Sequence, residues 1–260
     1  GDWKMGRIYR VTPKGHKGYR VPAFDTASYD GLKAAFASPA LSVRSLATLK
    51  IIEKGSAAVD DLKDLAASKD ARQRARALWL LGRLDEGRKD VEAMLRDPDP
   101  RFRVLAVRRL KTTAAGDFVR LTRPLLADPD AHVRRETLVQ LRDVAGKEAM
   151  ASIVGLASQY DGPDRWYLEA IAIACRGRES EAYQALTKSW AGRWPEAASG
   201  ITWVLHPPEA AALLAGRLGD PSLNDEDRKS LVRAVAELEG TAGGEALAKL
   251  LASDAPASLK

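Results

Sequence analysis

Four arginines recur at a regular spacing, and each could bind an anionic group. They lie 30, 29 and 31 residues apart, at Arg44, Arg74, Arg103 and Arg134. A guanidinium is permanently charged, and its planar fork of N–H donors suits phosphate and carboxylate groups. The spacing therefore predicts either a basic strip for phosphates, which neighbouring arginines would widen, or a set of ion pairs within the protein.

Acidic residues at the same spacing favour the ion pairs. Asp70, Asp99 and Asp130 each stand four residues before one of the regularly spaced arginines. Paired carboxylates and guanidinium groups form charge-assisted hydrogen bonds. We therefore predict a structural ladder, an Asp–Arg network that ties adjacent repeats together.

Aromatic residues are the second group that could contact a ligand or partner. Trp79 and Trp203 lie within the apolar runs ALWLL and GITWVL, which predicts core packing for both. The other candidates for an exposed aromatic patch, on one side of the fifth and sixth repeats, are Trp190, Trp194, Tyr160 and Trp166. We interpret this patch as a contact site for a protein partner.

No arrangement of residues predicts catalysis or cofactor binding. The sequence lacks a Cys-x-x-Cys-His haem signature, a Gly-rich phosphate loop and a Ser/His/Asp order. The three histidines are too scattered to suggest a metal site. Cys175 follows an apolar run, which favours a buried structural thiol. We predict no catalytic, cofactor-binding or metal-binding residues.

The elements that position these residues follow from a phrase that occurs twice, DPDPRFRVLAVRRL from Asp97 and DPDAHVRRETLVQL from Asp128. In each copy Pro ends one helix, and the second Asp can accept hydrogen bonds from the free amides of the next. The apolar residues that follow recur at helical spacing: Phe102, Leu105, Ala106 and Leu110, then Val133, Leu138 and Leu141. The phrase predicts a repeat of two helices.

The repeat continues along most of the chain. Further breaks rich in turn-forming residues fall at Ser38-Pro39, Ser68-Lys69-Asp70, Asp161-Gly162-Pro163 and Asp220-Pro221, and the ladder position extends loosely to Tyr167, Ala197 and Arg228. A steady period of two helices is the signature of an α-solenoid. We predict an all-α fold, an α-α superhelix of about six helix pairs with a closing helix at 245–252.

The first residues differ from the repeats. Residues 1–22 carry six basic residues against one acidic residue, whereas the repeats after them are nearly neutral. Arg7–Val11 is rich in β-branched and aromatic residues, as in a short strand, and Thr12–Gly18 suits a turn. The predicted organisation is a non-helical leader at 1–25, a solenoid at 26–252 and a frayed tail at 253–260. No stretch reaches the roughly 18 apolar residues of a membrane span.

Two resemblances add to this reading. The Val43-Arg44, Phe102-Arg103 and Val133-Arg134 steps after the breaks are similar to short bacterial HEAT-like repeats. The leader DWKMGRIYRVTPKGHK, followed by YRVP and SPALSVRSLA, resembles the junction in planctomycete-type membrane-bound dehydrogenases. In that family a sugar-dehydrogenase-like β-propeller precedes the HEAT-like region and a c-type cytochrome domain follows it.

This resemblance implies a non-catalytic interaction or spacer module of a larger extracytoplasmic or periplasmic oxidoreductase. The leader would be the end of the propeller, haem c would belong to the parent protein, and the partners would be domains of the same parent or another protein. The alternative is a DNA-binding enzyme of the alkylpurine glycosylase type, which also uses short HEAT-like repeats. The near-neutral charge of the repeats argues against specific nucleic-acid binding.

Overall fold

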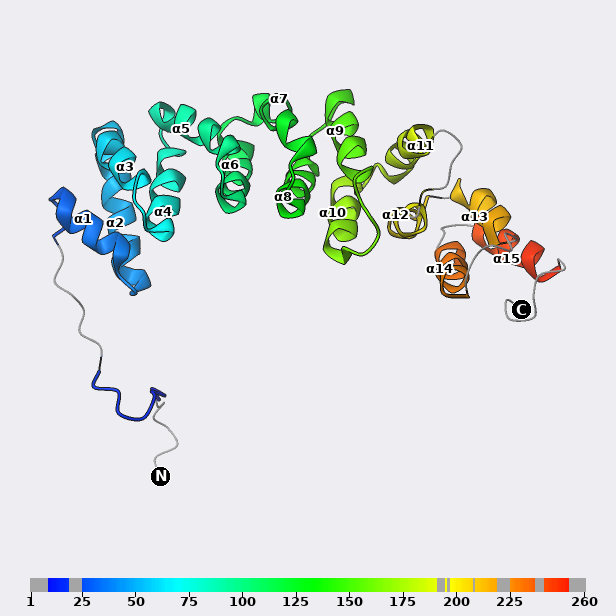
Figure 1. Cartoon of the computed structure of the whole chain (residues 1–260), viewed down its shortest axis with the longest axis horizontal. Coiled ribbons are helices and arrows are strands. Elements are labelled where there is room, and N and C mark those ends of the chain that lie inside the picture. Colours follow the sequence, from blue (N-terminus) through cyan, green and yellow to red (C-terminus); the bar gives the residue numbers. More distant parts are fainter. Residues whose placement is uncertain are drawn as a thin grey trace, which may run out of the picture. The chain divides into compact units, whose positions relative to one another are not determined.

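The computed structural model describes residues 9–18, 25–190, 195, 197–207, 209–218, 225–236 and 241–252. Throughout these residues the regular structure is helical, without a strand. The helices are packed against their neighbours in sequence, and they follow one another in pairs (Figure 1). The predicted fold class, an all-α helical-repeat protein, is confirmed.

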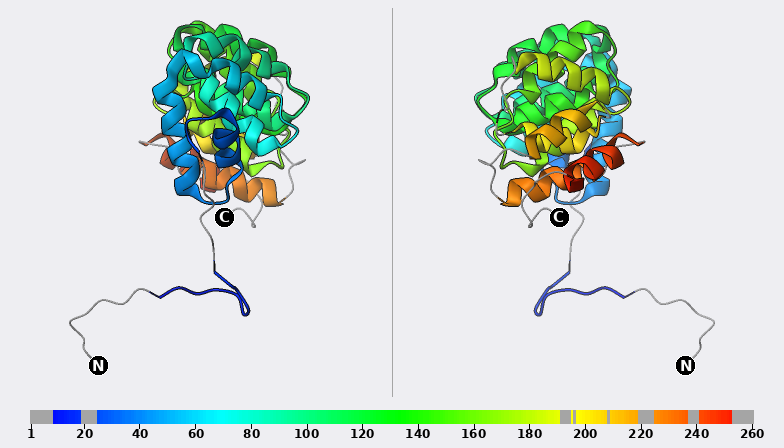
Figure 2. Two further views of the ribbon diagram at one scale, coloured as in Figure 1. Left: turned by 90° about the vertical axis from the view of Figure 1, so that its left-hand side faces the viewer. Right: turned by 90° about the vertical axis from the view of Figure 1, so that its right-hand side faces the viewer.

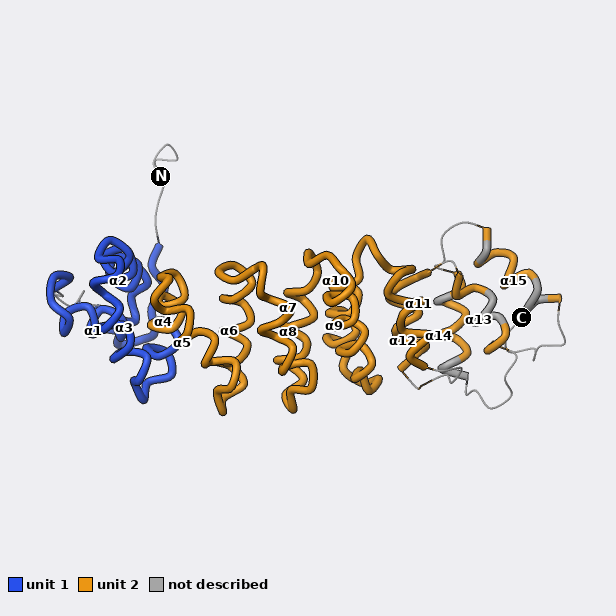
Figure 3. Tube along the Cα trace, turned by 90° about the horizontal axis from the view of Figure 1, so that it is seen from above, with its two compact units in different colours: residues 1–76 blue, residues 77–260 orange. Residues whose placement is uncertain are grey.

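The chain forms two compact units, residues 1–76 and residues 77–260 (Figure 3). In unit 1, α1 (Tyr29–Ala37) packs against α2 (Leu41–Lys54), and the short turn η1 (Gly55–Ala58) leads into α3 (Val59–Ala66). Helix α4 (Ala71–Leu81) begins in unit 1 and ends in unit 2.

Unit 2 alternates a first helix, which is often broken by a 3₁₀ turn, with a second helix. The first helices are α5 (Arg88–Ala93), α7 (Phe118–Thr122), α9 (Lys147–Ala157), α11 (Glu179–Ser189) and α13 (Ala210–Leu218). The second helices are α6 (Pro100–Thr113), α8 (Ala131–Leu141), α10 (Arg165–Cys175), α12 (Ala198–Leu205) and α14 (Asp225–Ala236). In Figure 1, α5, α7, α9 and α11 form the upper row, and α6, α8, α10 and α12 form the lower row. Each second helix therefore has other second helices as its lateral neighbours.

Aspartates start the second helices, as the repeated phrase predicted. Asp99 accepts a hydrogen bond from the Arg101 amide, and Asp130 accepts one from the His132 amide. Asp164 caps α10 in the same way through the Trp166 amide. These carboxylates satisfy amides that the first helical turn leaves without a partner.

The apolar residues predicted to face inward form the core. The predicted residues Leu110, Leu138 and Leu141 are fully buried, and the other helices contribute Leu32, Phe36, Leu62, Leu65, Ile153 and Leu186. Leu105 is only partly buried, whereas Val104 and Val107 are buried, so the buried face of α6 is displaced from the one that the apolar spacing predicted. Cys175 is buried, as predicted.

The described residues contain one helix pair more than the predicted number of about six. Helices α1 to α14 form seven pairs, and α15 (Ala242–Ala252) is the predicted closing helix, three residues longer at its start. The period gives six spacings, but six spacings separate seven repeats. The predicted frayed tail at 253–260 and the break at Asp220-Pro221 lie outside the described residues.

The leader shows the predicted turn but not the predicted strand. The His16 amide donates to the Pro13 carbonyl at 3.1 Å, and Gly15 has φ +86°, the left-handed value that a type II turn requires at its third position. Tyr9 and Val11 are exposed and lie outside any strand, because no second strand pairs with them among the described residues. Figure 2 shows 9–18 as an extended segment with this single bend. Arg7 and Ile8 lie outside the described residues.

The ladder arginines occupy one register. Arg44, Arg74, Arg103 and Arg134 are each the fourth residue of their helix. The extension of this position to Tyr167 and Ala197 is wrong, because Leu168 and Ile201 are the fourth residues of α10 and α12. The breaks before these two helices are longer, which shifted the sequence register.

Three of these arginines hold the backbone of the preceding break. Arg44 Nη1 donates to the Ser38 and Pro39 carbonyls at 2.8 Å each. Arg103 Nη1 reaches the Asp97 carbonyl at 2.7 Å, and Arg134 Nη1 reaches the Asp128 carbonyl at 2.6 Å. Each acceptor lies five or six residues before its arginine, so the guanidinium supplies donors to carbonyls at the end of the preceding helix.

The network between adjacent repeats forms through a different aspartate from the one we predicted. Arg103 donates from Nε and Nη2 to the two carboxylate oxygens of Asp128, both at 2.8 Å, and both side chains are buried. Arg134 instead reaches the Tyr167 hydroxyl of the next pair at 3.4 Å. Asp70, Asp99 and Asp130 accept hydrogen bonds from backbone amides at helix starts.

We predict that Arg103→Ala lowers the free energy of unfolding by about 3 kcal/mol, since it leaves the buried Asp128 carboxylate without its guanidinium. Arg101→Ala is the matched control on the same helix. Arg101 pairs with Asp99, but its side chain is 76% exposed, and its removal should cost much less than the removal of Arg103. Urea unfolding followed by circular dichroism measures both, and equal losses would contradict a buried network at Arg103.

Candidate functional site: the second-helix face of unit 2

A groove runs between two neighbouring second helices of unit 2. We call it the α8–α10 groove. Its volume is about 590 Å³, and its walls are His132, Arg135, Glu136 and Val139 from α8 and Trp166, Glu169, Ala170 and Ile173 from α10. These residues stand two, five, six and nine positions after the capping aspartates Asp130 and Asp164. The common register of the caps therefore places matching positions of the two helices on one face.

The groove combines apolar surface with charges that are already paired. Val139, Ala170 and Ile173 are its apolar lining, and Trp166 is 72% exposed beside them. Arg135 pairs with Asp164 at 3.0 Å, and Glu136 pairs with Arg108 of α6 at 2.6 Å. Such a surface offers contact area and shape to a macromolecule, whereas its charges are satisfied within the protein.

Glu136 is a buried carboxylate held in its ionised form. Burial by itself raises its pKa, but hydrogen bonds from Arg108 and Gln140 and the positive charge of Arg108 outweigh burial, so the pKa lies below the ordinary value of 4.5. The carboxylate thus connects α6 to α8 through Arg108.

A second cluster lies where α4 meets α6 within unit 2. The Arg109 guanidinium carbon is 5.0 Å from the centre of the Trp79 ring, a cation–π contact. Gly82 makes room for this arrangement, because a Cβ there would lie 2.5 Å from Arg109 Cγ and 2.9 Å from Val91 Cγ2. The glycine therefore leaves room for the side chains of Arg109 and Val91.

The predicted exposed patch of Tyr160, Trp166, Trp190 and Trp194 is wrong as a single surface. Tyr160 is 7% exposed and Trp190 is 8% exposed, whereas Trp166 belongs to the α8–α10 groove. The rings of Trp190 and Tyr183 form a T-shaped pair with centroids 6.0 Å apart, and the ring centroids of Tyr160 and Tyr167 lie 5.9 Å apart. Packing on these tyrosines buries both rings. Trp194 lies outside the described residues.

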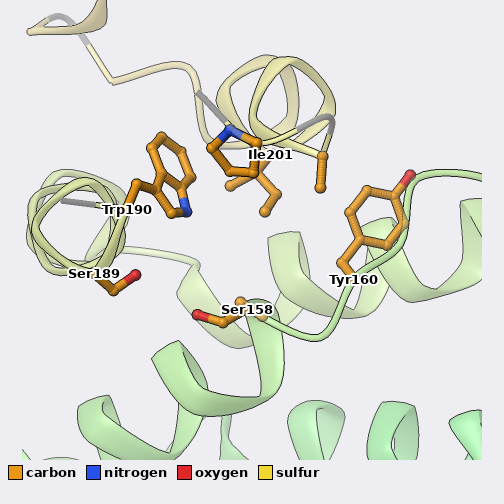
Figure 4. A pocket seen from close by; sticks show the side chains of 8 residues that line it. Ser158, Tyr160, Ser189, Trp190 and Ile201 are labelled. Carbon is orange, nitrogen blue, oxygen red and sulfur yellow. The ribbon is translucent and has the colours of Figure 1, made fainter. Parts of the chain in front are cut away.

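Tyr160 and Trp190 line a different pocket, of about 600 Å³, at α9, α11 and α12. Figure 4 shows the two rings on opposite sides of it, with Ile201 above and Ser158 below. The hydroxyls of Ser158 and Ser189 donate to carbonyls of their own helices, Val154 at 2.8 Å and Leu186 at 2.6 Å. These bonds give the two serines a structural role at the pocket mouth.

The prediction that Trp79 and Trp203 pack in the core is also wrong, since they are 40% and 39% exposed. Their apolar neighbours in sequence suggested burial. Trp79 is the ninth residue after the one that precedes α4, and Trp203 is the sixth residue after the one that precedes α12. In α8 and α10 the residues at the same two positions line the groove. Counting from the helix start would have placed both on the second-helix face.

In the described part of the chain, no three His, Cys, Asp or Glu side chains lie close enough together to hold a metal ion. Helices there are also too short or too polar to cross a membrane. Burial raises the pKa of the Cys175 thiol to about 12, so this cysteine is protonated at neutral pH.

The fold and this face define a class, an α-helical repeat protein with an amphipathic groove on its second helices. Comparison with protein-family models found no match, and comparison with curated proteins found none either.

We predict that Gly82→Ala lowers the free energy of unfolding by about 1 to 3 kcal/mol, because the added methyl overlaps Arg109 and Val91. Gly155→Ala is the matched control, since nothing lies within 4 Å of a Cβ there and alanine favours a helix interior. Thermal unfolding measures both. Equal melting temperatures for Gly82→Ala and the wild type would show that the Arg109 side chain can move away from the added methyl group.

A further prediction concerns pH. A carboxylate with a lowered pKa stabilises the fold above its unfolded pKa, and this stability is lost as pH falls through the folded pKa. For Glu136 that loss begins near 4.5 and continues below it. Glu136→Gln should therefore reduce the loss of stability between pH of about 5 and about 3. The control is Glu181→Gln at an exposed position, and parallel pH curves for wild type and Glu136→Gln would contradict the prediction.

Proposed function

We propose that this chain is a non-catalytic protein-binding module whose partner lies across the second-helix face of unit 2. The observation that carries the proposal is the α8–α10 groove, where a largely exposed Trp166 stands beside Val139 and Ile173. Exposed aromatic side chains next to apolar grooves supply much of the binding energy in protein interfaces. The paired charges at the rim would give orientation to the partner.

The resemblance of the leader extends this proposal to a parent protein. There the helical repeats would act as a spacer in an extracytoplasmic oxidoreductase and hold a β-propeller domain near a domain that carries haem c. Substrate oxidation and electron transfer would belong to those domains. A chain of packed helix pairs suits this role, because each pair is fixed by its neighbours.

The charge pattern of the groove supports a protein partner over DNA. A glycosylase-type groove needs basic side chains available to phosphates. Here Arg135 is engaged by Asp164 and Arg108 by Glu136, and Glu169 adds another carboxylate to the same groove. Phosphates would meet these carboxylates at close range.

The test uses the protein segments encoded on either side of this chain in its gene, each produced separately. We predict that at least one binds the chain in isothermal titration calorimetry and that Ile173→Glu weakens this binding at least about tenfold, since it places a charge in the apolar lining. Ala151→Glu is the matched control, because it adds the same charge at an exposed position of the first helix α9.

The outcomes separate the parts of the proposal. Binding that is weakened by Ala151→Glu and not by Ile173→Glu would place the partner on the first helices instead. If the neighbouring segments contain neither a propeller nor a haem-binding domain, the proposal that the parent protein is an oxidoreductase is contradicted. Both variants must retain the melting temperature of the wild type for the comparison to hold.

A further inference from the structure

We infer, on the basis of the proposed protein-binding function, that the partner carries an acidic segment and places a carboxylate on Arg83 and Arg109, beside the ring of Trp79. This assigns a carboxylate-binding subsite to the end of the second-helix face formed by α4 and α6.

The first observation is the environment of Arg109. Its Nε is buried and has no hydrogen-bond partner among the described residues, although its guanidinium lies over the exposed Trp79 ring. Burial and the nearby positive charge of Arg83 both lower the pKa of Arg109. A partly buried guanidinium beside a second cation gains from an added anion.

The second observation is the contrast with other arginines of the same helices. Arg103 has Asp128, Arg108 has Glu136 and Arg135 has Asp164, each at 3.0 Å or less. The surface of unit 2 therefore supplies carboxylates to the neighbouring arginines, whereas no ion pair to a carboxylate is found for Arg109 in the described part of the chain. A carboxylate from outside would complete the same pairing.

The third observation concerns which anion fits. Trp79 is 40% exposed and offers an apolar contact next to the two cations, so the subsite suits a carboxylate that is carried by a chain with apolar side chains. Farther along the same face, Glu136 and Glu169 would repel a phosphate backbone. The proposed occupant is an acidic amphipathic protein segment that would place its carboxylates on Arg83 and Arg109 and its apolar side chains in the α8–α10 groove.

The experiment selects peptides from one random phage-displayed library in parallel on the wild-type full chain and on three variants. Arg83→Gln with Arg109→Gln removes the two cations. Arg142→Gln with Arg176→Gln is the matched control, since both are exposed arginines of unit 2. Ile173→Glu disables the groove. Melting temperatures confirm that every variant is folded.

We expect peptides selected on the wild type and on the control to combine Asp or Glu with aromatic or aliphatic residues. The pool selected on Arg83→Gln with Arg109→Gln should lose its acidic residues, and the best acidic peptide should bind this variant about tenfold more weakly in fluorescence anisotropy. A different result would overturn this subsite and leave the proposed function standing. In that result, Ile173→Glu selects no peptides, whereas the peptides selected on Arg83→Gln with Arg109→Gln keep their acidic residues.

Two other outcomes also decide. Failure to select any peptide on the wild type would count against both the subsite and the proposed function. An oligothymidylate that binds the wild type more tightly than the acidic peptide, and loses that binding in Arg83→Gln with Arg109→Gln, would assign the two cations to phosphates and overturn the carboxylate proposal.

Discussion

The fold depends on how arginine side chains satisfy the ends of the first helices. A helix end leaves carbonyl groups without partners, and the short breaks between these helices offer few backbone donors to them. Arg44, Arg103 and Arg134 reach back to those carbonyls from the first turn of the next helix. Arg103 also binds Asp128 of the following break, so one buried guanidinium fixes a turn and joins two helix pairs. A lysine has neither the planar fork nor the number of donors to make these contacts together.

The contacts that fix where each second helix begins also determine which of its residues line the groove. Since the aspartate caps and the arginines set where α8 and α10 begin, the residues six and nine positions after the cap line the groove in both helices. Glu136 and Ala170 share the first of these positions, and Val139 and Ile173 share the second. The α8–α10 groove is thus a product of the same contacts that stack the repeats. Stability and the proposed binding surface are coupled through helix register.

The second-helix face of unit 2 differs in charge between the α8–α10 groove and the surroundings of Trp79. Around the groove Arg108 and Arg135 each have a carboxylate within the protein, which leaves the apolar residues as the main attraction for the proposed partner. At Trp79 two cations lie near each other and burial penalises one of them. In the proposed complex the two regions would therefore favour different groups of the partner, apolar side chains in the groove and a negative charge at Trp79.

The sequence by itself determined the helix pairs, their period, the capping aspartates and most of the core, because these depend on spacing along the chain and on contacts within a few residues. It also identified the ladder arginines. Only the tertiary structure decided that Arg103 binds Asp128 and not a capping aspartate, that Trp190 and Tyr160 are buried, and that Trp79 and Trp203 are exposed. Exposure of a large ring depends on which neighbouring helix covers it, and an apolar run in the sequence gives the same signal in both cases. The pairing of groups that lie a whole repeat apart is set by how successive helices stack, and spacing along one helix carries no information about that geometry.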